Sequence, residues 1–129
     1  MPLVRISLLK GRSPEEKKTL SDEIHAALVE SIKIPQTDFN RRIDEYTPGD
    51  WQLPPGKTEK FVMVEITMFP GRSREAKRKL YKEIVRRLET LGVPTTDVLI
   101  VLTEPPLENW GVRGGAPADE VDIGFELKV

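Results

Sequence analysis

The residue with the clearest chemical potential in this chain is Pro2, which directly follows Met1. An initiator methionine is usually removed before a small second residue, and the mature chain would then begin with a free secondary amine. An α-amino group has a pKa of about 7.7 to 8.0, so it can exchange protons near neutral pH. Apolar surroundings beside arginines would lower this pKa and favour a neutral base, whereas a nearby carboxylate would raise it and favour an acid. The alternative is that Pro2 simply starts a strand.

The composition argues against several other kinds of chemistry. The 129 residues include 20 basic and 21 acidic side chains, so the chain lacks the broad positive charge on which non-specific nucleic-acid binding relies. It has no cysteine and one histidine, His25, which leaves no thiolate site and no histidine cluster for a metal. No apolar run approaches the roughly 20 residues of a membrane span, and no signal peptide is recognisable. We expect a soluble, cytoplasmic protein that needs no metal or other cofactor and binds neither nucleic acid nor membrane.

Nearly the same segment occurs twice in the chain. GRSPEEKKTLSDEI begins at Gly11 and GRSREAKRKLYKEI begins at Gly71, and eight of the 14 positions are identical. Five later pairs match at an offset of 59 residues: Pro35 and Pro94, Thr37 and Thr96, Asp38 and Asp97, Glu45 and Glu104, Trp51 and Trp110. We therefore interpret the chain as one domain made of two pseudo-repeats, 2–51 and 61–110. A connector, 47–60, joins them, and a C-terminal hairpin and tail, 111–129, follows.

Each repeat has the pattern of a strand, a helix and a second strand. Alternating apolar residues predict strands over 3–9 and 61–69, and the segments 38–46 and 97–104 predict the second strands. Ser13 and Ser73 are suitable N-caps for the two helices, and Glu16 can complete a capping box with Ser13. Apolar residues at helical spacing follow each cap: Leu20, Ile24, Leu28 and Ile32 in the first helix, and Leu80, Ile84, Leu88 and Leu91 in the second.

These elements predict an α/β (α+β) fold. A helix between two strands makes a right-handed crossover that joins parallel strands, so two units form one four-stranded mixed sheet with both helices on one face. The strands also carry apolar residues that point to the opposite face: Leu3, Leu9, Phe61, Met63 and Phe69. Because the chain has no further helix to cover that face, we predict a homo-oligomer that associates through the sheet.

The ordered set of these features resembles the tautomerase superfamily. The segment PLVRISLLKGRSPEEKKTL is similar to the 4-oxalocrotonate tautomerase monomer, and TEPPLENWGVRGG resembles the strand-to-hairpin segment of the same family. The two-unit length, with DEIHAALVESIKIPQTD and ENWGVRGG, resembles the malonate semialdehyde decarboxylase branch. The resemblance covers essentially the whole chain, and it implies the tautomerase/MIF-like fold and a homotrimer.

The resemblance also implies roles for individual residues. Pro2 would be the catalytic proton-transfer residue. Arg72, from the other unit, would bind a substrate carboxylate or polarise its carbonyl, and Trp110 would form a wall of the pocket and exclude water. Asp38 matches the aspartate with which the decarboxylase branch orients water or stabilises the protonated amine. Because Asp97 occupies the same place in the second repeat, both aspartates could instead only shape the turn after the helix.

A second site is expected to be vestigial. By the same logic, Arg12 and Trp51 face the start of the second repeat, where Val62 stands in place of Pro2 and offers no amine. Both repeats would then build the scaffold, and only one of them would contribute a catalytic amine.

The sequence departs from the family at the carboxylate site. The decarboxylase pattern places another arginine where this chain has Pro70, and the strand arginine of 4-oxalocrotonate tautomerase falls on Asn40 in one repeat and Leu99 in the other. We expect Arg113, in the glycine-rich flap, to be the second substrate-binding arginine. Arg41 and Arg42 are the alternatives.

These expectations lead to one principal function and two alternatives. The principal function is keto–enol tautomerisation of a small 2-oxo or 3-oxo acid by a cofactor-independent enzyme that uses Pro2. The first alternative is a decarboxylase or hydratase that acts on a 3-oxo acid such as malonate semialdehyde. The second is a non-catalytic, oligomeric binding protein that retains the duplicated fold.

Overall fold

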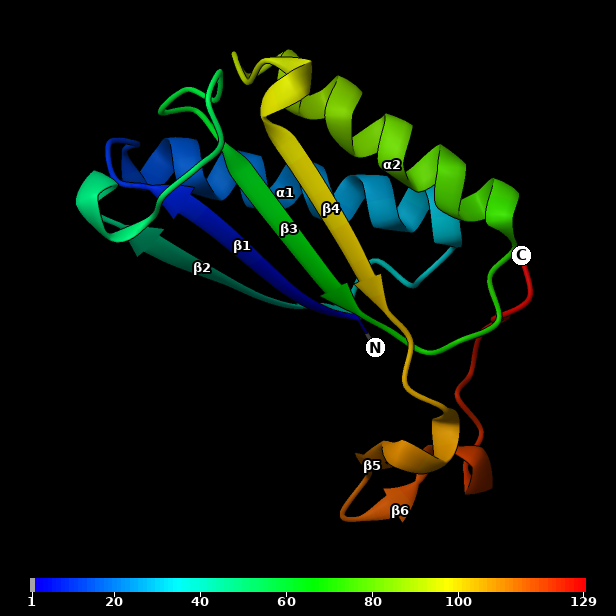
Figure 1. Cartoon of the computed structure of the whole chain (residues 1–129). Helices are drawn as coiled ribbons and strands as arrows, with labels where there is room; N and C mark the ends of the chain where they lie inside the picture. The colour runs from blue at the N-terminus through cyan, green and yellow to red at the C-terminus, as the bar shows by residue number, and fades with distance from the viewer. Residues whose placement is uncertain (1) are drawn as a thin grey trace.

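The structure is a computed structural model that describes residues 2–129, so the expected removal of Met1 lies outside the described residues. Figure 1 shows a twisted sheet backed by two helices, with a small lobe below it that contains the segment following the last strand of the sheet. The elements follow in the order β1 (Leu3–Leu9), α1 (Pro14–Ile32), β2 (Asn40–Tyr46), β3 (Val62–Thr67), α2 (Arg74–Glu89), β4 (Val98–Thr103), β5 (Gly111–Val112) and β6 (Ala116–Pro117).

The four long strands form one mixed sheet in the order β2-β1-β3-β4. β1 is parallel to β2 and β3 is parallel to β4, while β1 and β3 are antiparallel at the centre. Both helices lie on the same face of the sheet (Figure 1). The predicted tandem β-α-β fold is therefore confirmed, and the antiparallel central pair relates the two units by an approximate two-fold axis.

The helix starts follow the predicted caps. The Ser13 side chain accepts a hydrogen bond from the Glu16 amide at 3.1 Å, and the Glu16 carboxylate accepts one from the Ser13 amide at 2.9 Å, which completes the capping box. Ser73 accepts a hydrogen bond from the Ala76 amide. At the other end the prediction is wrong for Leu91. The helix α2 ends at Glu89, so Leu91 lies beyond it with an exposed side chain, and Val93 is buried instead.

The core lies between the sheet and the two helices. The remaining predicted helix residues, from Leu20 to Ile32 and from Leu80 to Leu88, pack against the inward-facing residues of β1 and β3. The repeat is visible in the polar contacts as well. Lys17 pairs with Glu45 at 2.9 Å in the first unit, and Lys77 pairs with Glu104 at 2.5 Å at the equivalent place in the second.

The face of the sheet opposite the helices is less apolar than expected. Leu9, Phe61 and Phe69 are buried within the chain itself, so the prediction that they are left uncovered is wrong. The ring of Trp51 packs on Phe61, and the ring of Trp110 packs on Phe69.

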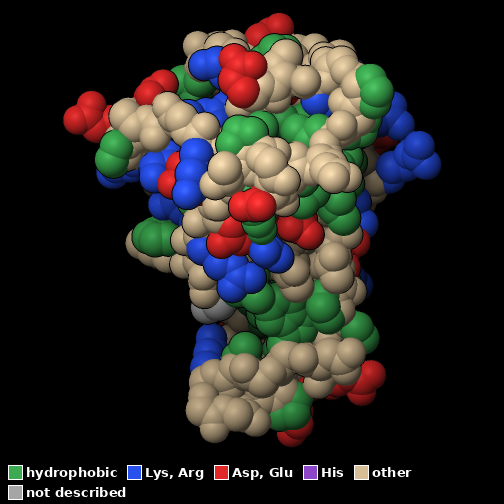
Figure 2. Space-filling view, turned by 60° about the vertical axis from the view of Figure 1, so that its left-hand side comes forward, with side chains coloured by type: hydrophobic (Ala, Val, Ile, Leu, Met, Phe, Trp, Pro, Cys, Tyr) green, Lys and Arg blue, Asp and Glu red, His purple; other side chains and the backbone are tan. Residues whose placement is uncertain are grey.

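Charged and apolar side chains share what remains of this face. Arg5 on β1 pairs with Asp44 on β2, whereas Leu99 and Val101 on β4 are 48% and 44% exposed. Figure 2 shows one side of the molecule, with basic and acidic side chains intermixed across its middle and a hydrophobic area below them, next to the small lobe. Exposed apolar surface therefore remains on β4, and also on β1 at Leu3, which is 39% exposed and so is uncovered as predicted.

The small lobe begins with the β5–β6 hairpin, and the tail then returns to the main body (Figure 1). The Ser73 amide, at the start of α2, donates a hydrogen bond to the Val129 carbonyl at 2.9 Å. The tail therefore connects the lobe to the beginning of the second helix. Within residues 2–129, no helix has both the length and the apolar character needed to cross a membrane.

Candidate active site

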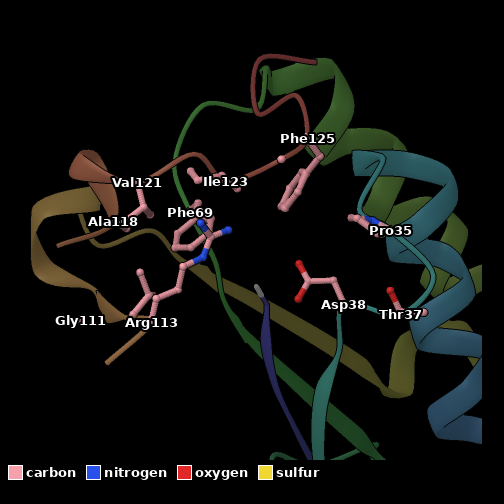
Figure 3. A pocket seen from close by; sticks show the side chains of 12 residues that line it. Pro35, Thr37, Asp38, Phe69, Gly111, Arg113, Ala118, Val121, Ile123 and Phe125 are labelled. Carbon is pink, nitrogen blue, oxygen red and sulfur yellow. The ribbon is translucent and has the colours of Figure 1, made fainter. Parts of the chain in front are cut away.

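The pocket with the strongest candidate chemistry lies between the first unit, the hairpin and the tail. Its volume is about 500 Å³. The turn after α1, the end of β3, the hairpin and the tail all contribute to its wall, through Pro35, Thr37, Asp38, Phe69, Gly111, Val112, Arg113, Ala118, Val121, Ile123, Gly124 and Phe125. In Figure 3 the Asp38 carboxylate points into the pocket from one side and Arg113 reaches into it from the other. The sequence-predicted residues Asp38 and Arg113 therefore meet at one pocket.

The register of the sheet brings Pro2 to the same region. Leu3 pairs with Asn40 on β2 and with Thr67 on β3. Pro2 comes directly before Leu3. It therefore lies between two segments: the one that leads from Asp38 into β2, and the one that leads from β3 to Phe69. Pro2 is buried, and the ribbon of β1 ends between Asp38 and Arg113 in Figure 3.

Asp38 belongs to a tight turn between α1 and β2. The Asp38 amide donates a hydrogen bond to the Pro35 carbonyl at 3.0 Å. Proline followed by polar residues favours such a turn, because the ring restricts the backbone and the polar side chains tolerate its conformation. In this unit the Asp38 side chain lies at the pocket wall.

Arg72 lies behind the pocket lining. Its side chain is 6% exposed and its Nη1 donates a hydrogen bond to the Phe69 carbonyl at 3.0 Å. The guanidinium also lies over the ring of Phe125, 5.9 Å from its centroid. Burial lowers the pKa of Arg72, while the negative charges of Glu104 and Asp38 act in the opposite direction. Arg72 is thus close enough to Asp38 to feel its charge, but Phe69 and Phe125 line the pocket in front of it.

The Arg72 guanidinium retains unused hydrogen-bonding capacity. Within residues 2–129, its Nε is buried and has no hydrogen-bond partner. A buried donor without a partner is costly.

Trp110 supports the pocket through Phe69. The two rings meet edge to face with 4.8 Å between their centroids, and the Trp110 Nε1 donates a hydrogen bond to the Pro105 carbonyl at 3.1 Å. Trp110 is therefore fixed by a polar contact at one end and an aromatic contact at the other. It stands behind the pocket wall and does not itself line the cavity.

The other candidate arginines differ in their positions. Arg113, at the tip of the hairpin, has a positive φ of 47° and lines the pocket. Arg41 donates hydrogen bonds to Ser21 and Asp22, away from this pocket. Arg42 borders a separate hollow on the strand face that also includes Arg5 and Glu65. Of these three arginines, Arg113 alone borders the site.

Two family comparisons match most of the chain between them. Residues 39–113 and residues 2–57 each match a family described as tautomerase enzyme. The probable tautomerase YusQ of Bacillus subtilis (strain 168) is 31% identical over 121 residues, which cover 89% of this chain and 95% of that protein. The chain belongs to the tautomerase superfamily, in its fused two-unit form.

Solved structures from the superfamily share the whole fold. A malonate semialdehyde decarboxylase superimposes with a TM-score of 0.81 at 28% identity, and the match covers 87% of this chain and 92% of that one. A fused 4-OT, described as a symmetric trimer, superimposes with a TM-score of 0.80 at 26% identity, over 91% and 96% of the two chains. The likeness extends through both units of this tautomerase-superfamily chain.

The equivalent region of the second unit is built differently. Arg12 donates a hydrogen bond to the Lys60 carbonyl at 2.9 Å, and Trp51 packs on Phe61 with 5.6 Å between centroids. Both residues therefore lie near the start of β3, as expected for the counterpart of the first site. Asp97, the counterpart of Asp38, is 1% exposed and accepts hydrogen bonds from the amide and hydroxyl of Thr58. The connector occupies the second region and engages its carboxylate.

The tail supplies pocket residues that the sequence reasoning missed. Val121, Ile123 and Phe125 all line the cavity. A signal for them exists, because Val121, Ile123, Phe125, Leu127 and Val129 alternate with polar residues or glycine and are all partly buried. In the described chain, residues 2–129, no group of three or more metal-ligating side chains gathers in one place.

Proposed function

We propose that this chain is a cofactor-independent tautomerase in which the Pro2 nitrogen, exposed by removal of Met1, transfers a proton next to the carbonyl of a small 2-oxo or 3-oxo acid. The observation that carries the proposal is that the Asp38 carboxylate and the Arg113 side chain line one pocket, and that the register of β1 places the buried Pro2 next to this region. The membership of a family of tautomerase enzymes supports the same conclusion.

The proposed reaction uses each residue for one task. The neutral Pro2 nitrogen takes a proton from the carbon next to the substrate carbonyl, and the electron pair of that C–H bond forms the enolate. Protonated Pro2 then gives the proton to the enolate oxygen, which completes the enol; in the reverse direction Pro2 takes the enol proton and returns it to the carbon. Arg113 binds the substrate carboxylate, for which a guanidinium offers paired donors. Arg72 polarises the carbonyl oxygen once Phe125 gives access to it, and Asp38 stabilises the protonated amine.

The first test measures tautomerisation of phenylenolpyruvate by the native protein and by Pro2→Ala. We expect a loss of about 10²- to 10⁴-fold in kcat/KM, the usual contribution of a positioned acid–base group. A matched control carries one extra residue before Pro2, so that the ring remains but its nitrogen becomes an amide. This control should be as inactive as Pro2→Ala. Retention of Met1 on the native protein, seen by mass spectrometry, would contradict the proposal and favour a non-catalytic binding protein.

A second candidate is decarboxylation or hydration of a 3-oxo acid such as malonate semialdehyde. The decarboxylase likeness over 87% of the chain and the presence of Asp38 in the pocket wall favour it. In this reaction the bond to the carboxylate breaks to release carbon dioxide, its electron pair forms an enolate opposite protonated Pro2, and the enolate takes up a proton to give acetaldehyde.

The two reactions can be separated with one substrate panel. Release of carbon dioxide from malonate semialdehyde would support decarboxylation, whereas proton exchange without release would support tautomerisation. A covalent adduct after borohydride treatment in the presence of substrate would indicate an iminium on Pro2.

We also propose that the protein assembles as a homotrimer through the sheet. The fused 4-OT with a TM-score of 0.80 is described as a trimer, and Leu99 and Val101 expose apolar surface on β4. Analytical ultracentrifugation should therefore show a trimer that Val101→Glu dissociates. Leu91→Glu is the matched control, because Leu91 is also an exposed apolar residue but follows α2. A monomeric native protein would contradict this proposal.

A further inference from the structure

His25 is the one histidine of the chain and lies on α1, away from the pocket lining. Its side chain is 8% exposed. The Nε2 atom lies 2.8 Å from the carbonyl oxygen of Gln36. A carbonyl can only accept, so Nε2 carries a proton and donates this hydrogen bond. Within residues 2–129, Nδ1 is buried without a hydrogen-bond partner. Burying a polar atom without a partner costs free energy, so an apolar side chain would fill this part of the core better than histidine.

The contacts of His25 bracket Asp38. Gln36 precedes Asp38 by two residues, and Phe39 follows it directly. The imidazole meets the Phe39 ring edge to face, with 5.3 Å between centroids and 72° between planes. One side chain from the helix therefore holds the backbone before Asp38 through a hydrogen bond and the residue after it through an aromatic contact.

The second unit provides an internal comparison for this arrangement. Its turn has the same backbone bond, from the Asp97 amide to the Pro94 carbonyl at 2.9 Å. The counterpart of His25 is Val85, which cannot donate a hydrogen bond. There the aspartate carboxylate itself braces the turn, through the amide and hydroxyl of Thr58 on the connector. The same turn is thus held by a helix histidine in one unit and by its own aspartate in the other.

We propose that His25 is a positioning residue that orients the turn carrying Asp38, so that the carboxylate stands at the pocket wall. The inference rests on the proposed role of Asp38 in the reaction. His25 touches neither substrate nor Pro2 in this proposal. It acts through the Gln36 carbonyl and the Phe39 ring, and a small displacement of a positioned group is sufficient to reduce a rate.

The first experiment compares two substitutions by kinetics. His25→Phe keeps a ring against Phe39 but removes the donor to Gln36, and His25→Gln restores a donor at a similar reach. We expect His25→Phe to lower kcat about 10-fold with little change in KM, and His25→Gln to recover most of that loss. In an Asp38→Asn background, His25→Phe should add less than about a twofold loss, because residues that act through one another are not additive. Losses that multiply would overturn the proposal.

The second experiment does not depend on activity. Amide hydrogen exchange at Asp38 reports the bond to Pro35, and exchange at Asp97 reports the equivalent bond in the second unit of the same molecule. His25→Phe should accelerate exchange at Asp38 about 10-fold and leave Asp97 unchanged, whereas His25→Gln should leave both unchanged. Equal acceleration at both sites would indicate general destabilisation, and no acceleration at Asp38 would also overturn the inference.

The outcomes distinguish this inference from the proposed function. If Asp38→Asn retains full activity, the catalytic role of Asp38 fails, and the inference about its positioning fails with it. If Asp38→Asn is impaired but His25→Phe retains full activity and slow exchange at Asp38, only the role of His25 fails. If His25→Phe does not fold, His25→Asn replaces it, because its shorter side chain places the donor too far from Gln36.

Discussion

Asp38 and Asp97 occupy equivalent places in the two units, yet their carboxylates have different surroundings. Asp38 lines a pocket of about 500 Å³ beside the start of β1. Asp97 is buried and bonded to Thr58 of the connector. The element that follows each unit makes the difference. The connector crosses the second region, whereas the hairpin and tail surround the first and leave it hollow.

The GRS turns show the same divergence. Gly71 has a φ of +128° and lies against Leu127 of the tail, while Gly11 has a φ of +141° and open space around it. Arg72 is buried beneath Phe125, and Arg12 reaches the backbone of Lys60. In this duplicated scaffold the tail therefore encloses a pocket beside Asp38, whereas the connector covers the equivalent aspartate, Asp97.

The largest difference between the two units is expected when each aspartate is replaced by asparagine. Asp38→Asn should lower kcat about 10²-fold, because the negative charge opposite Pro2 is lost. Asp97→Asn should instead lower stability by about 1 to 3 kcal/mol, because one of the Thr58 donors loses its acceptor. Steady-state kinetics and denaturant unfolding of both variants measure the contrast. Similar activity losses in the two variants would show that both aspartates merely shape their turns.

A second comparison concerns two arginines that line different hollows. Arg113 lines the pocket beside Asp38, and Arg12 lines a separate hollow near Lys60. Arg113→Ala should raise KM for an oxo acid about 10-fold with little change in kcat, since it removes charged hydrogen bonds to the substrate carboxylate. Arg12→Ala should leave KM unchanged. An unaltered KM in Arg113→Ala would remove this arginine from the carboxylate site.

Replacing the glycine of each GRS turn by alanine tests how tightly the tail packs against the second turn. Alanine at either position adopts an unfavourable positive φ, which costs about 1 to 3 kcal/mol in each case. A Cβ at Gly71 would also come within 3.2 Å of the Leu127 backbone, whereas a Cβ at Gly11 would meet nothing within 4 Å. Gly71→Ala should therefore be less stable than Gly11→Ala by about a further 1 kcal/mol. Equal thermal unfolding midpoints for Gly71→Ala and Gly11→Ala would show that the tail moves away from the new methyl group without loss of stability.

The smallest expected effect is a pH-dependent one on the second helix. Hydrogen bonds from Arg86 and Arg87 lower the pKa of Glu83 from 4.5 to about 2. Its contribution to stability is therefore complete above pH 4.5 and is lost as the pH falls towards 2. Because this network is near the surface, Glu83→Gln should cost about 0.5 kcal/mol at pH 7 and nothing near pH 2.

The matched control for that measurement is Glu23→Gln, since Glu23 is the counterpart of Glu83 in α1. Glu23 accepts a hydrogen bond from Arg87 at 3.3 Å, which is longer than the 2.8 Å bond from Arg86 to Glu83. It should show a smaller difference across the same pH range in urea unfolding. A difference for Glu83→Gln that persists at pH 2 would show that packing, not charge, carries its effect.

Local patterns were sufficient to predict most of the scaffold. The capping box at Ser13, the alternation in β1 and β3 and the helical spacing after each cap depend on near neighbours in the chain, and the structure confirms them. The prediction that Leu91 belongs to the apolar face of the second helix was wrong, because the helix ends at Glu89 although the apolar pattern continues. The prediction of an uncovered face was wrong for Leu9, Phe61 and Phe69, because residues from distant segments pack over this face, such as Trp51 on Phe61 and Trp110 on Phe69.

The sequence by itself determined the duplicated units, the residue types available for chemistry and the asymmetry between Pro2 and Val62, because these are properties of the chain order. Only the tertiary structure decided that the tail encloses one region, that the connector occupies the other, and that His25 contacts the residues on either side of Asp38. These features depend on contacts between segments far apart in the chain. No local pattern specifies such contacts, since they form only when the two units pack across the central antiparallel strands.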